Sequence, residues 1–232
     1  MGFPSASAIW RNYVRLKGTL TLTNMKVMAV CIGHAETLRG KRSKTGINKH
    51  QMHGPLSLGN AGLAGDAVCD RRYHGGPDQA VYVEGSISLN RWREEFGRSI
   101  KYGEFGENLV IKELDNETIA VGDRLSMGDV ILEATAPRMP CATLGAKLQD
   151  PNFVKQYRRA ERPGFYCRVI AGGELSAGMD VAFHAFGGLR ITMPQMMRDY
   201  GKTISGQALE AYLLAPIHHK LRASLATGKV KF

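Results

Sequence analysis

Between residues 25 and 186, apolar residues recur in short runs that alternate with polar residues and are bounded by Gly, Asp or Pro. A period of two predicts β-strands, because successive side chains of a strand point to opposite faces. Many short strands with few long helices favour a barrel or sandwich over an alternating parallel α/β fold. The predicted strands are residues 25–33, 54–58, 79–83, 108–111, 124–127, 130–136, 165–171 and 180–184.

Two helices are predicted among these strands. Residues 86–96 place large apolar side chains at helical spacing among Arg and Glu, and Gly97 follows as a typical helix end. Residues 151–159 form the second predicted helix. The expected fold class is therefore mainly β and barrel-like, with a few peripheral helices.

The last part of the chain has a different pattern. Residues 193–200 and 207–226 are rich in helix formers, and Pro216 interrupts the second stretch. Residues 187–232 are therefore predicted to be a small helical appendage to a β-domain at 25–186. Residues 1–24 are predicted to be a dispensable extension, since MKVMAV at 25–30 is typical of a start that leads into a first strand.

Composition and charge exclude two classes of protein. The chain has 232 residues, and it contains no run of about 18 apolar residues that could span a bilayer. The net charge of +10 is carried by the ends: residues 1–35 hold four bases and no acid, and residues 188–232 hold seven bases and two acids. This distribution argues against a nucleic-acid interface and leaves solvated tails or an acidic partner as alternatives.

The four cysteines lie far apart, with no CxxC pair and no secretory leader. A disulfide framework is typical of smaller, cysteine-dense secreted chains, so we expect reduced thiols and a cytoplasmic protein. The seven histidines are equally scattered and offer no spacing for structural zinc.

Residues 74–78 (HGGPD) form the first cluster that could carry chemistry. The two glycines allow the backbone to approach a ligand, and His74 and Asp78 supply a donor, an acceptor and a charge. A turn capped by these side chains is the alternative. Glu107 and Asn108, in residues 105–109 (FGENL), could bond the amide edge of a heterocycle or satisfy a bulge.

Cys141 ends the most informative cluster, residues 137–141 (PRMPC). Two prolines rigidify the lead-in, and Arg138 places a cation three residues before the thiol, which favours the thiolate. The alternatives are a small buried side chain and the nucleophile of a cysteine hydrolase, with His74 as base and Asp66 or Asp78 orienting it. No Walker loop, GxGxxG or HExxH motif is present.

Six motifs then define a resemblance by their order and spacing. They are residues 44–49 (KTGINK), 62–66 (GLAGD), 74–81 (HGGPDQAV), 105–109 (FGENL), 121–123 (VGD) and 137–141 (PRMPC). Together they resemble the MOSC domain family, in its YiiM-like branch, over about residues 26–184. Residues 189–230 resemble the small three-helix domain that follows the MOSC domain in that branch.

The resemblance implies a MOSC-type β-barrel that binds the molybdenum cofactor (molybdopterin), with Cys141 as the metal ligand. It also implies reduction of N-hydroxylated compounds of the hydroxylamino purine or amidoxime type. Because the chain shows no flavin, haem or iron–sulfur motif, we expect the electrons to come from a separate flavoprotein or ferredoxin-like reductase. His74, Asp78 and Glu107 are the expected proton donors. The residues expected to bind the cofactor are Lys44, Lys49, Gly75, Gly76, Asn108 and Arg138. The alternative function is a carrier of the cofactor or of sulfur, with a persulfide on Cys141.

Overall fold

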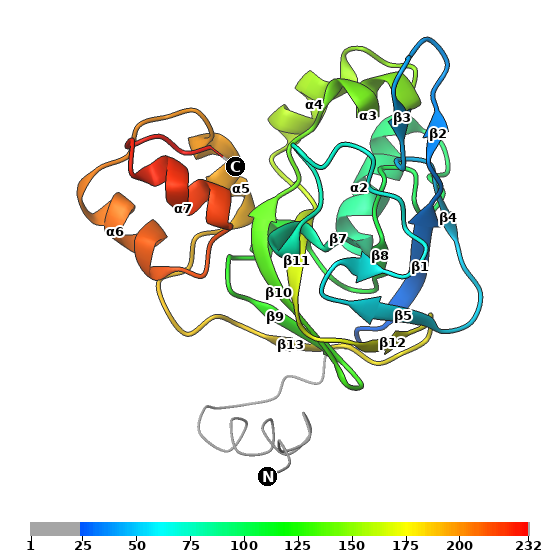
Figure 1. Ribbon diagram of the computed structural model, residues 1–232, viewed down its shortest axis with the longest axis horizontal. Coiled ribbons are helices and arrows are strands. Elements are labelled where there is room, and N and C mark those ends of the chain that lie inside the picture. The colour runs from blue at the N-terminus through cyan, green and yellow to red at the C-terminus, as the bar shows by residue number, and fades with distance from the viewer. Residues whose placement is uncertain (1–23, 232) are drawn as a thin grey trace.

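A computed structural model describes residues 24–231, and a large mixed sheet forms its centre (Figure 1). β7 and β8 run parallel, pairing Val83 with Leu109, and the other neighbouring strands of this sheet are antiparallel. Its strands, in their order across the sheet, are β13 (Ala182–His184), β9 (Arg124–Met127), β10 (Val130–Pro137), β11 (Phe165–Ala171), β7 (Val81–Gly85), β8 (Leu109–Ile111), β1 (Val27–Gly33) and β4 (Lys49–Gln51).

The described residues form no closed barrel, so the predicted barrel is corrected to an open, mixed sheet. The end strands β13 and β4 do not pair with each other. The segment before β13 meets the start of β1 at a single bridge between Lys26 and Asp180. No longer ladder forms there: the three residues of β13 pair with β9, and β1 pairs with β8 and β4.

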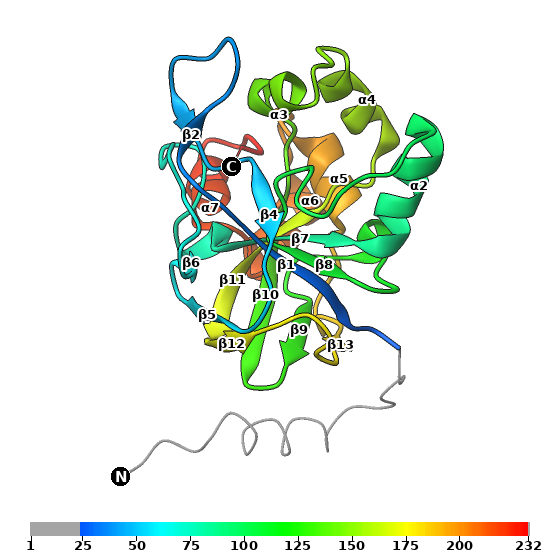
Figure 2. The same ribbon diagram turned by 90° about the vertical axis from the view of Figure 1, so that its right-hand side faces the viewer.

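Two smaller sheets flank the large one. Their strands are two to four residues long, too short for a visible alternation of polar and apolar residues, and only β5 was predicted. Figure 2 shows the segment that begins with β2 projecting beyond the large sheet. The first small sheet contains β12 (Gly173–Leu175), β5 (Leu56–Gly59) and β6 (Gly62–Leu63), and the second contains β2 (Glu36–Thr37) and β3 (Lys44–Thr45).

Helices lie in two groups around the sheet (Figure 1). α2, α3 and α4 contribute Trp92, Leu144 and Phe153 to a core that covers one face of β1 and β8. α5, α6 and α7 gather on another side, and Pro216 lies between α6 and α7, as predicted. The helices are α2 (Ser86–Phe96), α3 (Ala142–Lys147), α4 (Phe153–Ala160), α5 (Met193–Asp199), α6 (Gly206–Leu214) and α7 (His219–Leu225), with short 3-10 turns η1 (Pro77–Gln79) and η2 (Asn116–Thr118).

β1 separates two apolar cores. Val30 and Ile32 enter one core, whereas Ala29 and Cys31 enter the other, as the period of two requires. Burial on both faces explains the nearly continuous apolar run of this strand. α7 packs Leu221 into the same core as Val30, so the C-terminal helices and the sheet share one apolar interior.

The predicted extension, residues 1–24, lies outside the described residues except for Asn24. The division at residues 186 and 187 stays a prediction. Within residues 24–231, no helix has both the length and the apolar character that a membrane crossing needs.

Candidate functional site

Cys141 lies where a central strand of the large sheet passes into a helix. β10 ends at Pro137, and Cys141 is the extended N-cap residue of α3, with φ −123° and ψ 165°. The backbone N–H of Arg138 donates to the carbonyl oxygen of Gly164 at 2.8 Å, which ties the lead-in to the chain before β11. The half-buried thiol is therefore held by backbone on a rigid element.

The pKa of the Cys141 thiol is lowered to about 5. Burial alone raises this pKa, but the His74 side chain, the charge of Arg138 and the backbone N–H of Leu144 outweigh it. Cys141 is therefore a thiolate at neutral pH, the form that ligates metals and attacks electrophiles. By contrast, burial raises the pKa of Cys31 to about 12 and also raises that of Cys167.

Arg138 brings a buried positive charge to the thiol. Its Nη2 lies 3.9 Å from the Sγ of Cys141, and its guanidinium carbon lies 5.7 Å from the ring centroid of Tyr82. The side chain is only 3% exposed, and its Nε has no hydrogen-bond partner among residues 24–231. Since a buried charge needs compensation, the guanidinium and the thiolate stabilise each other.

His74 reaches the thiol from a loop that two glycines bend. Gly75 and Gly76 have φ angles of 74° and 84°, which side-chain-bearing residues rarely adopt. A Cβ on Gly75 would also lie 2.8 Å from the Cγ1 of Val68. The HGGPD sequence therefore sets the path of the loop, and the loop places the imidazole at Cys141.

Cys141 and His74 line a pocket of about 420 Å³, which we call the Cys141 pocket. Its walls come from the segments at residues 38–49, 66–75 and 105–108, from β7 with the residues just before it, from β11, and from the segment that follows β10. Most of the sequence-predicted site residues meet here. They are Lys44, Lys49, His74, Gly75, Asn108, Arg138 and Cys141.

Asp66 joins two of these residues in one wall. Both its carboxylate oxygens accept from Nζ of Lys49, at 2.5 and 2.6 Å, and Oδ2 also accepts from Nδ2 of Asn108 at 2.9 Å. The side chains of Lys49 and Asp66 are 9% and 8% exposed, so this is a buried ion pair. Lys49 is thus neutralised within the protein, whereas Lys44 is exposed at the pocket.

Three predicted site residues do not line the Cys141 pocket: Gly76, Asp78 and Glu107. Glu107 is fully buried and accepts from the backbone N–H groups of Gly103 and Phe105, at 2.6 and 3.0 Å. Burial raises the pKa of Glu107 to about 7 despite these bonds. Glu107 therefore fixes the turn before β8 and does not face the thiol.

Asp78 turns away from the thiol and towards α7. Its Oδ1 accepts from Nε of Arg168 at 2.7 Å, and its Oδ2 accepts from the backbone N–H of His219 at 2.8 Å. Burial raises the pKa of Asp78, but His219 and Arg168 together bring it below its usual value. Asp78 is therefore a buried carboxylate that joins the HGGPD loop to the C-terminal region.

Asp78, His218 and His219 place potential ligand atoms within 4.8 Å of one another. Two features disfavour a cation there. Arg168 already neutralises Asp78, and Nδ1 of His218 accepts from the backbone N–H of Lys220 at 3.0 Å. A neutral imidazole that accepts at one nitrogen carries its proton on the other, so His218 has no lone pair left for a metal.

Sequence reasoning missed several walls of the Cys141 pocket. Tyr82 and Tyr166 are paired residues on β7 and β11, and their ring centroids lie 5.5 Å apart. Gln79 also lines the pocket, and its buried Oε1 has no hydrogen-bond partner among residues 24–231. Alternation along two adjacent strands could have placed both tyrosines on one face, but the strand pairing was not available from the sequence.

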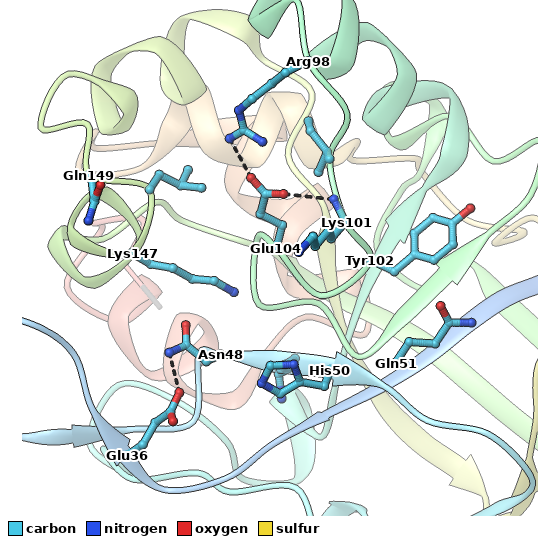
Figure 3. A pocket seen from close by; sticks show the side chains of 13 residues that line it. Glu36, Asn48, His50, Gln51, Arg98, Lys101, Tyr102, Glu104, Lys147 and Gln149 are labelled. Carbon is cyan, nitrogen blue, oxygen red and sulfur yellow. Dashed lines mark hydrogen bonds and ion pairs between the residues drawn. The ribbon is translucent and has the colours of Figure 1, made fainter.

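A second, larger cavity of about 880 Å³ lies beyond Lys49, which lines both cavities. Figure 3 shows Arg98 joined to Glu104 on one side of it, and Asn48 joined to Glu36 on the other. It contains no cysteine. Of its charged groups, Arg98 and Glu104 pair with each other, Lys101 is exposed, and Lys147 donates to backbone carbonyl oxygens. Without a soft metal ligand, this cavity is a poorer candidate for redox chemistry.

Comparison with known proteins identifies relatives of this chain. The model of the MOSC domain family matches residues 70–182. The uncharacterized protein YflK of Bacillus subtilis is 31% identical over 157 residues, which cover 67% of this chain and 71% of YflK. A protein named reductase from Gibberella moniliformis is 32% identical over 143 residues, covering 60% of this chain but only 25% of that protein.

A solved structure has the same fold. The crystal structure of YiiM from Geobacillus stearothermophilus superposes with a TM-score of 0.70 at 22% identity, covering 88% of this chain and 98% of that one. The likeness therefore extends over most of the chain.

Proposed function

Because the chain belongs to the MOSC domain family, we propose that it is an oxidoreductase that binds a molybdenum cofactor in the Cys141 pocket and reduces N-hydroxylated compounds. The observation that carries this proposal is the ionised thiol of Cys141, held between His74 and Arg138. A thiolate is a soft ligand that suits a sulfur-rich metal centre. The relative named reductase supports redox chemistry for this kind of chain.

The residues of the pocket suit such a cofactor. Arg138 and Gln79 each have a buried polar atom without a partner among residues 24–231, so a donor and an acceptor remain unused at the pocket. The rings of Tyr82 and Tyr166, tilted by 44° to each other, give the pocket aromatic surface against which a heterocycle could pack. Lys44, exposed at the pocket, is better placed than the paired Lys49 to bind a phosphate.

When bound, the molybdenum cofactor supplies a two-electron redox centre. Conversion of an N–OH group to N–H and water consumes two electrons and two protons, so the protein must deliver protons to the substrate. His74 is the titratable side chain next to Cys141 in the pocket and is our proposed proton donor. Asp78 and Glu107 lie off the pocket, and we propose that they fix backbone instead.

The electrons are proposed to come from a separate reductase. The sequence has no recognisable flavin, haem or iron–sulfur motif. Residues 188–232, with seven bases and two acids, would suit an acidic surface on that partner.

Production in two hosts tests the proposal. The protein is purified from a host that makes molybdopterin and from one that cannot, and molybdenum, pterin and Cys141 persulfide are measured per chain. We expect molybdenum and pterin together in the first preparation, and turnover of an N-hydroxylated purine or an amidoxime with a chemical electron donor. A persulfide without pterin would instead support the sulfur carrier, and the absence of pterin from the competent host would refute the proposal.

A further inference from the structure

The first turn of α7 contacts the chain on both sides of His74. Nζ of Lys220 donates to the carbonyl oxygen of Arg72 at 2.7 Å, two residues before His74. The backbone N–H and ring Nδ1 of His219 lie 2.8 and 2.7 Å from Oδ2 of Asp78, four residues after His74. These contacts join segments that are more than 140 residues apart in the chain.

Asp66 and Ala67 fix the start of the loop, through Lys49, Asn108 and Gly33, but residues 68–76 have few contacts that would fix them. No strand or helix is assigned between residues 64 and 76, and His74 donates its backbone N–H to Asp70 at 3.0 Å within a turn. Gly75 and Gly76 add backbone freedom in the unfolded chain. A loop of this kind takes its position from the contacts that it makes with other elements.

The start of α7, which makes those contacts, is itself fixed by burial. Leu221 and Leu225 are buried in the apolar core, and His218 is 0% exposed. Arg168 reinforces the junction from β11, since its Nη2 donates to the carbonyl oxygen of Ile217 at 3.1 Å while its Nε donates to Asp78. The side chain of His219 is 58% exposed, so its contact with Asp78 contributes little to the apolar core.

We infer that His219 and Lys220 are positioning residues that hold the His74 loop so that its imidazole meets the Cys141 thiol. The C-terminal helical region is then part of the active site's support and more than an appendage. This inference rests on the proposed function, because it takes His74 and Cys141 as the reactive pair. His219 and Lys220 act only through the loop, since neither lines the Cys141 pocket.

The test measures the ionisation of Cys141 in the full chain purified from a host without molybdopterin. Iodoacetamide alkylation of Cys141 is followed by mass spectrometry across pH 4 to 9, for wild type, His219→Ala, Lys220→Met and the double variant. Loss of a hydrogen bond to the thiolate changes its proton affinity about tenfold, so the pKa of Cys141 in the double variant should rise by about one unit. The double variant should then react about tenfold more slowly at pH 4 but only about twofold more slowly at pH 6. His219→Asn can keep a donor near Oδ2 of Asp78 and should restore most of the rate.

Two controls separate positioning from general damage. Lys202→Met removes an exposed lysine of the same helical region and should leave the profile unchanged. In a His74→Ala background, the double variant should cause no further change, because the effect passes through His74. Thermal unfolding checks that every variant is folded.

A wild-type profile for the folded double variant would overturn the inference. So would a wild-type profile for His74→Ala, since the loop would then have no effect on the thiol to transmit. Neither result decides the proposed function, which is judged separately by the molybdenum and pterin content of the wild-type protein.

Discussion

The two cavities on either side of Lys49 differ more in their chemistry than in their size. The larger one, about 880 Å³, is lined by charged and polar side chains, among them the ion pair of Arg98 with Glu104 at 2.6 Å, and by no cysteine. The Cys141 pocket is about half as large but holds a thiolate, a buried guanidinium and an imidazole. The groups that the proposed function needs, a thiolate with a buried cation beside it, therefore lie in the smaller cavity, and volume alone does not identify it.

Lys49 and Lys147 show how the boundary between the cavities is built. Burial lowers the pKa of Lys49, and it lowers the pKa of Lys147 to about 8. Lys147 donates to the carbonyl oxygens of Ile47 and Gly103, and Lys49 binds Asp66. Both ammonium groups therefore stabilise the wall between the two cavities. Substitutions in one cavity are then expected to leave the other cavity unchanged.

The largest effect is expected from Cys141→Ala. Removing the proposed metal ligand should reduce molybdenum and pterin per chain to background, measured by elemental analysis and pterin fluorescence after production in a competent host. Cys69→Ala is the matched control, because Cys69 also lines the pocket but is exposed. Equal loss in both variants would contradict a specific role for Cys141.

Arg138→Met should have the next largest effect. Loss of the buried cation 3.9 Å from the thiol should raise the pKa of Cys141 and slow its alkylation at pH 6 by at least about tenfold. Arg98→Met, at the larger cavity, should leave that rate unchanged. An unaltered rate in a folded Arg138→Met variant would show that Arg138 does not stabilise the thiolate.

Glu84 contacts Tyr82, a lining residue of the Cys141 pocket, from outside the pocket. We expect it to make the free energy of unfolding depend on pH. It is fully buried, it accepts from Tyr82 at 2.5 Å and from Asn116 at 2.6 Å, and burial raises its pKa from 4.5 to about 7. The folded protein therefore holds a proton that the unfolded chain releases between about pH 4.5 and 7. The free energy of unfolding should fall as the pH rises through this window.

Glu84→Gln isolates that contribution. The glutamine amide can donate to the hydroxyl of Tyr82 and accept from Asn116 without titrating, so the loss of stability between pH 5 and 8 should shrink by about 2 kcal/mol. Urea unfolding at the two pH values measures it. Glu104→Gln, at the larger cavity, should keep the wild-type dependence, and an unchanged dependence in Glu84→Gln would mean that this carboxyl is ionised throughout the window.

The smallest effect is expected from Lys101→Ala in the larger cavity. Lys101 is exposed and forms no ion pair among residues 24–231. Its removal should change the free energy of unfolding by less than about 0.5 kcal/mol and leave cofactor content unchanged. Clear loss of molybdenum or pterin would instead assign the larger cavity a part in cofactor binding.

Long, strongly patterned elements were predictable from the sequence. The helix at residues 86–96 and the strand that became β10 carry enough apolar residues at a fixed period to specify their type. α3 was missed because it has six residues, follows a proline and contains Gly145. The closure of the barrel was mispredicted because it depends on pairing between the two ends of the sheet, β13 and β4, which no local pattern encodes.

Within the site, too, local interactions were predictable from the sequence and long-range interactions were not. Arg138 and Cys141 are three residues apart, so their interaction followed from local sequence. Asp78 was placed with His74 because both belong to HGGPD, yet its partner His219 lies 141 residues away. Which side of a loop a carboxylate faces depends on these long-range contacts, and so the sequence identified the motif without assigning the direction of each side chain.

The central claim is that Cys141 holds the metal, and protection from alkylation tests it most directly. The protein loaded with cofactor is treated with iodoacetamide at pH 6, where the free thiolate reacts, and the modified fraction of Cys141 is compared with molybdenum per chain. We expect the unmodified fraction to equal the fraction of chains that contain molybdenum, and to vanish when the cofactor is removed. Full modification of Cys141 in chains that retain molybdenum would contradict the account.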